Sequence, residues 1–267
     1  MPPLSLVLDD HGIYFDATRP SRLDHLIAQS GDLGDHARSR VTRLIDSLQA
    51  HQISKYNLDR APETAGLPAG YHLVLGQVED DASIEFGAID IRTNDALLQR
   101  VRQGQPDATI VYKPHPDVQA GLRQGAVTHT EFADHILENA NITQALEGAI
   151  AVHTITSLGG FEALLRGVPV HCYGLPFYAG WGLTHDTLKA PHWRRRHVEL
   201  WQLAHATLID YPRYFDPIYK TATSPERVIA LLANGLEARQ SALLRFLAKL
   251  QGWALSPPFD RSYRRRK

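Results

Sequence analysis

TITSLGGFEALLRGVPVHCYGLPFYAGWGLTHD, residues 154–186, combines a polar loop, a helix, a strand and an aromatic loop. The loop at 156–160 contains two glycines and opens the helix, which carries one acid, Glu162. The apolar strand 168–172 then runs into the aromatic and glycine-rich loop 177–182. Unpaired backbone N–H groups and the positive end of the helix dipole favour an anion at such a helix start. The stretch therefore predicts a helix–strand unit that holds a nucleotide phosphate.

Short apolar strands alternate with helices on either side of this stretch. Strands are predicted at 72–75, 109–112, 149–152 and 168–172, and helices at 94–102, 131–139 and 157–166. This alternation predicts an α/β fold, a parallel sheet with helices on both faces. Ligands bind such sheets beyond the carboxyl ends of the strands. Polar loops follow three of the strands, so we expect the loops 77–83, 113–116 and 153–157 to meet at one edge.

The first of these loops carries three consecutive acids, Glu79, Asp80 and Asp81, shortly after Gln77. A carboxylate that points into a cleft can act as nucleophile, base or cation stabiliser in glycosyl chemistry. The alternative is an acidic turn in solvent.

The second loop, Lys113-Pro114-His115-Pro116, places a cation and an imidazole at a strand end. Lysine binds phosphate as a point charge, and histidine donates to phosphate oxygens or carries a proton. The alternative is a proline-rich turn with both side chains on the surface.

Ser157 is the expected N-cap of the third segment, where its hydroxyl and nearby N–H groups suit a phosphate. Glu162 is placed to accept hydrogen bonds from ribose hydroxyls, and its alternative is a helix-surface acid. For Gly159 and Gly160, the alternative is close packing of the helix on a strand.

The aromatic loop contains Phe177, Tyr178, Gly180 and Trp181. The alternative is that these aromatic residues belong to the hydrophobic core, which is the more common place for such residues. Interleaved with glycines and following a proline, these residues instead favour a shaped loop that stacks on a ring.

The composition is that of a globular protein, with 267 residues, 43% hydrophobic residues and a net charge of −1. The sequence has no excess of basic residues, so its charge does not indicate a nucleic-acid partner. The single cysteine, Cys172, lies in an apolar run, which predicts a packed side chain and a reducing compartment. The sequence has no membrane-spanning apolar run and no signal peptide, so we expect a cytoplasmic protein. Phosphate-loop and metalloprotease motifs are missing, and the histidines lack metal-ligand spacing, so neither a metal nor a cofactor is expected.

The rest of the chain predicts further elements and a division into regions. A hairpin is predicted from 4–8 and 13–15, a capping box at Ser21–Asp24, a helix at 35–49, and a mostly helical region after 198 with an interruption at 211–219. A Pro- and Gly-rich loop at 60–70 is the expected boundary. We expect an N-terminal region (1–65), a nucleotide-binding domain (66–196) and a helical C-terminal region (197–267).

Two basic clusters occur, at 194–196 and in the tail 261–267. Such clusters usually form solvated surface. The alternative is attraction to anionic lipid at the inner membrane, worth about 1 kcal/mol per basic residue.

Several longer motifs occur together in one order. They are GQVEDDAS (76–83), YKPHPDV (112–118), SLGGFEALLRGVPV (157–170), YGLPFYAGWGLTHD (173–186), DDHGIYFDATRPSRL (9–23) and TLIDYPRYFDP (207–217). Together they resemble the capsule polysaccharide biosynthesis proteins of the KpsC/LipB type over most of the chain.

This resemblance implies a retaining β-Kdo glycosyltransferase of GT-B-like fold that uses CMP-Kdo. It implies an acceptor that is a lipid-linked glycan at the cytoplasmic face of the inner membrane, in the synthesis of a poly-Kdo linker. Asp81, four residues beyond Gln77, would be the nucleophile, with Asp80 and Glu79 as neighbouring candidates. His115 and Pro116 would bind the CMP phosphate, and the Ser157 loop the rest of the nucleotide.

The resemblance and the residue patterns together define the expected site. It comprises Asp81, Asp80 and His115 for catalysis, Gln77, Lys113, His115, Pro116, Thr156, Ser157, Gly159, Gly160 and Glu162 for donor binding, and Tyr178, Gly180 and Trp181 as a substrate loop.

Modules of this family carry further α/β elements before the segment that matches 3–16, so we expect an incomplete acceptor-side domain. The alternatives are that the chain is a fragment, a split gene product, or a half that a partner polypeptide completes. The alternatives to a transferase are a non-catalytic subunit that binds a CMP-sugar or glycan, and a transferase for another CMP-activated acid sugar.

Overall fold

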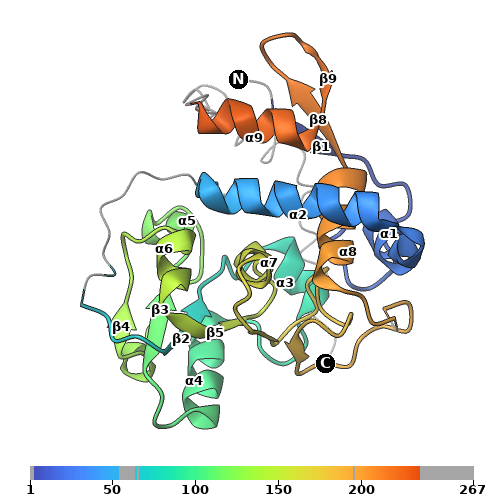
Figure 1. The fold of residues 1–267 in the computed structure, drawn as a ribbon. Coiled ribbons are helices and arrows are strands. Elements are labelled where there is room, and N and C mark those ends of the chain that lie inside the picture. Colours follow the sequence, from blue (N-terminus) through green and yellow to red (C-terminus); the bar gives the residue numbers. More distant parts are fainter. Residues whose placement is uncertain (1–2, 54–63, 65, 195, 235–267) are drawn as a thin grey trace.

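The chain folds around a six-stranded parallel sheet and a separate three-stranded antiparallel sheet, as a computed structural model shows (Figure 1). The structure describes residues 3–53, 64, 66–194 and 196–234. The large sheet has the strand order β4-β3-β2-β5-β6-β7, and the small sheet has the order β1-β8-β9. The predicted α/β fold with a parallel sheet is confirmed.

The elements have the following bounds. The strands are β1 (Ser5–Val7), β2 (Tyr71–Leu75), β3 (Ile110–Lys113), β4 (His135–Ile136), β5 (Ala149–Thr154), β6 (Val170–Cys172), β7 (His185–Asp186), β8 (Pro212–Asp216) and β9 (Thr221–Thr223). The helices are α1 (Arg22–Gln29), α2 (Asp35–Ala50), α3 (Ala82–Gly87), α4 (Asn94–Gly104), α5 (Pro116–Gln119), α6 (Ile142–Glu147), α7 (Leu158–Leu165), α8 (Leu200–His205) and α9 (Pro225–Ala233). Short 3-10 turns cover Ser30–Asp32 and Thr130–Phe132, and a π-helical turn covers Ala206–Asp210.

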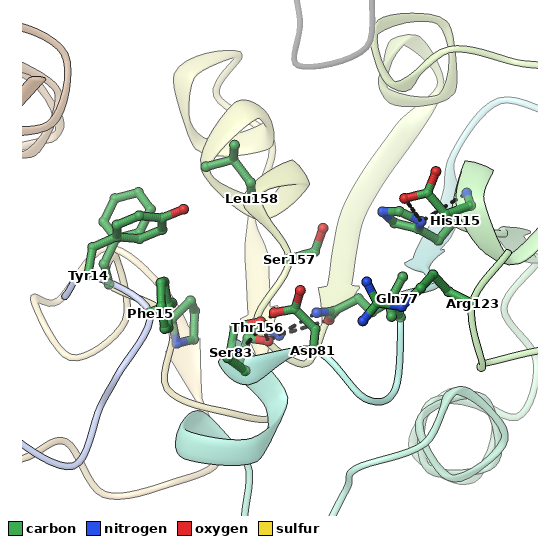
Figure 2. Close-up of a pocket in the computed structure, with 15 residues that line it drawn as sticks. Tyr14, Phe15, Gln77, Asp81, Ser83, His115, Arg123, Thr156, Ser157 and Leu158 are labelled. Carbon is green, nitrogen blue, oxygen red and sulfur yellow. Dashed lines mark hydrogen bonds and ion pairs between the residues drawn. The ribbon is translucent and has the colours of Figure 1, made fainter. Parts of the chain in front are cut away.

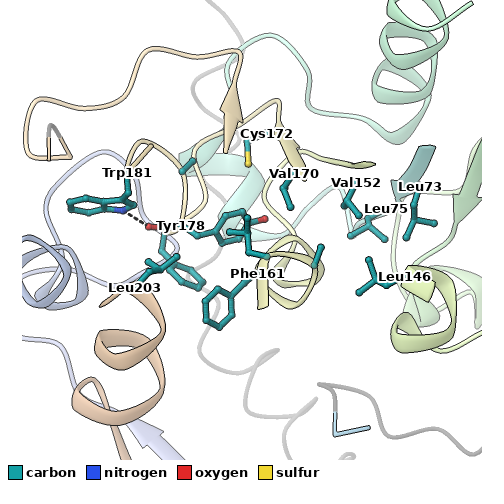
Figure 3. Close-up of a cluster of buried hydrophobic side chains, with 14 of the residues drawn as sticks. Leu73, Leu75, Leu146, Val152, Phe161, Val170, Cys172, Tyr178, Trp181 and Leu203 are labelled. Carbon is teal, nitrogen blue, oxygen red and sulfur yellow. Dashed lines mark hydrogen bonds between the residues drawn. The ribbon is translucent and has the colours of Figure 1, made fainter. Parts of the chain in front are cut away.

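The two faces of the parallel sheet bury two hydrophobic clusters. Leu73 and Leu75 of β2 face the cluster that includes α7 and Cys172 (Figure 3). Val74, between them, faces the opposite cluster, which includes α4. Alternate side chains of a strand point to opposite faces, so the consecutive apolar residues Leu73, Val74 and Leu75 are buried on both sides of the sheet. The predicted burial of Cys172 is confirmed.

The predicted N-terminal hairpin is wrong. β1 pairs antiparallel with β8, about 200 residues further along the chain, and residues 13–15 form no strand. The Asp9 carboxylate accepts hydrogen bonds from the backbone N–H groups of His11, Gly12 and Arg22, each at 3.0 Å. These bonds bend the chain towards α1, whose predicted capping box, Ser21 with Asp24, is confirmed.

The predicted helix at 131–139 is also wrong. The segment forms a 3-10 turn and then β4, the edge strand beside β3. The Asp134 carboxylate accepts from the Ile110 N–H at 2.7 Å and from Arg102 Nη2 at 2.6 Å. These bonds align the segment with β3, and this tertiary contact outweighs its helical pattern.

The C-terminal region contains the predicted helices, α8 and α9, and the predicted interruption at 211–219, which contains all of β8. β1 pairs with β8 and helix α2 packs against α8 and α9, so the N-terminal and C-terminal parts of the described chain lie side by side (Figure 1). Most of the 60–70 loop lies outside the described residues. The division into three regions stays a prediction.

The prediction that Arg194 belongs to a solvated or lipid-binding basic cluster is wrong. Its side chain is buried, and Nε lies 2.8 Å from Asp24 Oδ1. Its Nη1 donates to the Pro176 carbonyl at 2.6 Å. A buried charge needs such partners, so Arg194 joins α1 to the aromatic loop. Arg195 and the basic tail 261–267 lie outside the described residues.

Histidines form a row across one face of the parallel sheet. His153, His171 and His185 are adjacent in register on β5, β6 and β7, with ring centroids 4.7 Å and 4.6 Å apart. His72 joins the row through a 2.9 Å hydrogen bond between its Nδ1 and His153 Nε2. Burial, together with His171 and His72, lowers the pKa of His153 from 6.5 to about 3. Burial also lowers the pKa values of His72 and His171.

We expect the row to make the fold sensitive to acid. Below about pH 6.5 the unfolded chain binds protons on His72, His153 and His171 that the folded chain excludes. The free energy of unfolding should therefore fall as the pH drops from about 6.5 towards 3. His153→Gln should flatten this dependence by up to about 1.4 kcal/mol per pH unit.

Urea unfolding between pH 7 and pH 4 measures this slope. His36→Gln, which changes an exposed histidine of α2, is the control and should keep the wild-type slope. Equal slopes for wild type and His153→Gln would contradict the prediction.

Candidate active site

The three predicted polar loops meet at the carboxyl edge of the parallel sheet. β3, β2 and β5 are neighbours in the strand order, and the chain crosses from one side of β2 to the other between β4 and β5. A crevice forms at such a switch point, because the chain leaves β2 towards β3 and leaves β5 towards β6, in opposite directions along the sheet. The prediction that the loops after these strands share one edge is confirmed.

Gln77 joins two of these loops and is 5% exposed. Its Oε1 accepts hydrogen bonds from Thr154 Oγ1 at 3.1 Å, Ile155 N at 3.1 Å and Thr156 N at 2.9 Å. Its Nε2 donates to Thr156 Oγ1 at 3.0 Å. These four bonds use both ends of the amide to shape the loop, and Gln77 also lines the main cavity, so its role in donor binding stays a prediction.

The structure separates the three consecutive acids. Glu79 Oε1 accepts from the Asn94 N–H at 2.7 Å at the start of α4. Asp80 is paired with Arg123, with 3.0 Å between Asp80 Oδ1 and Arg123 Nη2. Asp81 is the N-cap of α3, accepting from the Ser83 N–H at 2.8 Å, and it lines the largest cavity of this edge. Of the three acids, Asp81 is the one on the cavity wall.

Two cavities lie side by side at this edge. The main cavity, of about 400 Å³, is bounded by Asp81, Ser83 and Arg123 (Figure 2). The side cavity, of about 70 Å³, is bounded by Lys113 and Glu162. The two cavities share His115, Ser157 and Leu158 as lining residues. An extended ligand can therefore occupy both, with its middle at the start of α7.

The shared wall provides hydrogen-bond donors for an anion. Ser157 is the N-cap of α7, where its Oγ accepts from the Gly159 N–H at 3.2 Å. His115 is the N-cap of the short α5 and accepts from the Asp117 N–H through Nδ1 at 3.2 Å. Since Nδ1 is the acceptor, the neutral ring carries its proton on Nε2. Both residues lie where the sequence predicted a phosphate.

The other predicted donor residues fall into two groups. Pro116, Gly159 and Glu162 line the side cavity, and Thr156 lines the main cavity. Glu162 also lies 3.9 Å from Arg166 in an ion pair. Gly160 lines neither cavity. A Cβ at Gly160 would clash with Tyr178 Oη, and one at Gly159 would lie 2.7 Å from Leu75 Cδ1. Close packing against Tyr178 therefore explains why residue 160 is a glycine.

The predicted stacking role of the aromatic loop is wrong for Tyr178 and Trp181. Both side chains are fully buried in the core (Figure 3). Trp181 Nε1 donates to the Phe177 carbonyl at 2.8 Å, and Tyr178 Oη donates to the Ser157 carbonyl at 2.5 Å. Gly180 has a φ of +87°, and a Cβ there would lie 2.7 Å from Ala190 Cβ. Tyr178 and Trp181 therefore support α7 from the core, whereas Phe177 of the same loop lines the main cavity.

The main cavity includes residues outside the expected catalytic, donor-binding and substrate-loop residues, and one of them, Phe177, belongs to the aromatic loop that was expected to stack on a ring. They are Tyr14, Phe15, Val78, Ala82, Ser83, Asp117, Arg123, Leu158, Pro176 and Phe177. Tyr14 and Phe15 were assigned to a strand, and only the fold brings them opposite Asp81. Arg123 lies between two glycines in a loop without secondary-structure pattern, and a lone arginine there is a weak signal.

Two further findings concern the described residues. No group of three or more His, Cys, Asp or Glu side chains among them is placed to hold a metal ion. Within the same part of the chain, each helix is too short or too polar to cross a membrane.

Gly160→Ala tests the packing role of this glycine. Because the added methyl displaces Tyr178, we expect a loss of about 1–3 kcal/mol in the free energy of unfolding. Tyr178→Phe in the same chain should recover part of that loss, since it removes the clashing oxygen. Gly104→Ala in α4, with no heavy atom within 4 Å of the new Cβ, is the control and should not destabilise. Equal effects of the two glycine substitutions in urea unfolding would refute the packing role.

The chain matches known capsule proteins over most of its length. A family profile described as "Capsule polysaccharide biosynthesis protein" matches residues 1–67 and 60–214. The capsule polysaccharide modification protein LipA of Neisseria meningitidis serogroup B is 48% identical over 236 residues, which are 87% of this chain and 33% of LipA. The lipopolysaccharide-processing protein LpsZ of Rhizobium meliloti is 39% identical over 86% of this chain and 54% of LpsZ. The chain thus spans about a third of LipA and about half of LpsZ.

Two solved structures of Thermosulfurimonas dismutans KpsC share the fold. Its β Kdo 2,7 transferase matches with a TM-score of 0.74 and 40% identity, over 88% of this chain and 73% of that one. Its β Kdo 2,4 transferase matches with a TM-score of 0.80 and 34% identity, over 87% and 74%. These matches and the parallel sheet bear out the expected GT-B-like fold. The chain belongs to the capsule polysaccharide biosynthesis family, of the KpsC/LipB type.

Proposed function

We propose that this chain is a glycosyltransferase module that transfers Kdo from CMP-Kdo with retention of configuration. The observation that carries the proposal is the pair of cavities that meet at His115 and Ser157, with Asp81 on the wall of the larger one. The likeness to two Kdo transferases supports the same activity. CMP-Kdo is a substrate here, and the proposed reaction requires no further cofactor.

The nucleoside is proposed to occupy the side cavity. Glu162 at its wall would accept from ribose hydroxyls. The phosphate would then lie at the shared wall, where His115 and the start of α7 donate hydrogen bonds to it. The sugar would enter the main cavity, in which the acceptor glycan also has room.

The proposed chemistry takes two displacements at the anomeric carbon. The Asp81 carboxylate attacks this carbon, the bond to the phosphate oxygen breaks, and CMP leaves with the electron pair. The resulting glycosyl ester is attacked by an acceptor hydroxyl, whose proton passes to a base, and the Asp81 carboxylate is released. His115 is the proposed base for that proton, and to accept it at Nε2 the ring first carries its own proton on Nδ1, which gives up the hydrogen bond from the Asp117 N–H. Two inversions together retain the configuration.

Asp81→Asn tests the nucleophile. Asparagine keeps an N-cap oxygen for α3 but cannot form the ester, so transfer should fall roughly 10³-fold or more. The assay combines CMP-Kdo with a β-Kdo-terminated acceptor, and intact mass spectrometry detects a Kdo adduct on the protein. Asp107→Asn, an exposed acid before β3, is the control and should keep both transfer and adduct.

The rival hypotheses give different results in the same assay. Transfer that requires an added polypeptide would support a subunit that binds the CMP-sugar without turning it over alone. Preference for another CMP-activated acid sugar in competition would change the donor assignment. No transfer and no Asp81-dependent adduct would refute the proposed mechanism. The lipid-linked acceptor and the contact with the inner membrane are parts of the same proposal.

A further inference from the structure

Arg123 is the one lysine or arginine among the described residues that line the main cavity. Its side chain is partly exposed, and it lies on the same side of Asp81 as His115 (Figure 2). Tyr14 and Phe15 lie on the opposite side. The positive charge that lines the cavity therefore lies on the His115 side of Asp81.

The loop that carries Arg123 is attached to the loop that carries the acids. The Gln124 carbonyl accepts from the Glu79 N–H at 3.1 Å. Asn94 Nδ2 donates both to the Gln77 carbonyl at 2.8 Å and to the Gly125 carbonyl at 2.7 Å. Gly125 has a φ of +131°, and a Cβ there would lie 2.6 Å from the Gln77 carbonyl oxygen. Arg123 thus has a defined position relative to Asp81.

Asp80 determines which edge of the guanidinium is available. Its Oδ1 accepts from Arg123 Nη2 at 3.0 Å and from Nε at 3.3 Å. One Asp80 oxygen thus takes the edge formed by Nε and Nη2. The other edge, formed by Nη1 and Nη2, has two parallel N–H groups, which suit a second carboxylate.

An acid sugar of the proposed donor class brings a second carboxylate to this place. In a 2-ulosonic acid the carboxylate is bonded directly to the anomeric carbon. When Asp81 attacks that carbon, two carboxylates approach each other within a few bond lengths. Two like charges at close range repel each other, and a cation nearby offsets this repulsion.

We propose that Arg123, oriented by Asp80, binds the carboxylate of the acid-sugar donor in the main cavity. This inference rests on the proposed function. It identifies Arg123 as the residue that makes the site prefer an anionic sugar over a neutral one. Asp80 is a positioning residue in this scheme, which distinguishes it from the neighbouring nucleophile.

The test compares the KM for CMP-Kdo, the Kd for CMP alone and the formation of the Kdo adduct. Arg123→Gln should raise KM for CMP-Kdo about tenfold or more and leave the Kd for CMP alone unchanged, since the lost contact is to the sugar. Arg123→Lys should restore part of the affinity, because it keeps the charge without the planar fork. Asp80→Asn should raise KM less than Arg123→Gln does and still form the Kdo adduct, unlike Asp81→Asn.

A neutral donor analogue completes the test. When the donor carboxylate is replaced by a primary amide, wild type and Arg123→Gln should differ by less than about twofold, whereas with CMP-Kdo they differ about tenfold. Arg38→Gln, which removes an exposed arginine paired with Glu199 on the surface, is the matched control and should behave as wild type.

The outcomes separate the two proposals. If wild type transfers Kdo but Arg123→Gln keeps its KM, the role of Arg123 is refuted and the proposed function stands. An equal loss of affinity for CMP and CMP-Kdo would place Arg123 at the phosphate and also refute the inference. If wild type neither binds nor transfers CMP-Kdo, both proposals fail.

Discussion

Hydrogen bonding of the buried Gln77 amide is the constraint on which the rest of the site depends. A primary amide carries both an acceptor and donors, so it can satisfy two backbone N–H groups and two threonine hydroxyls at once. Its own backbone bonds with Asn94, which in turn holds Gly125. A buried polar group left unpaired costs about 1–3 kcal/mol, so this network stabilises the observed arrangement of the loops.

This arrangement gives each acid after β2 a different task. Glu79 caps the start of α4, Asp80 pairs with Arg123, and Asp81 starts α3 at the cavity wall. Adjacent residues in a turn point in different directions, so three identical charges in sequence meet three different environments. In the proposed reaction the same separation lets one carboxylate attack while its neighbour orients a cation.

Much of the framework could be predicted from local sequence. The strands β2, β3, β5 and β6 follow from apolar runs, and the start of α1 follows from its capping box, because each depends on residues close together in the chain. The edge strand β4 and the pairing of β1 with β8 were not predicted, because both depend on partners that are distant in sequence. The same holds for Tyr14, Phe15 and Arg123, which reach the cavity only through tertiary contacts.

The stretch 154–186 illustrates which features follow from the local sequence and which depend on the tertiary structure. By itself the sequence determined the polar start of α7, the following strand and the convergence of three loops at one sheet edge, since parallel strands share the direction of their carboxyl ends. Only the tertiary structure decided that Tyr178 and Trp181 support the helix from the core while Asp81 faces the cavity. Local patterns specify the elements, but burial and contact depend on which distant residues fill the space around each side chain.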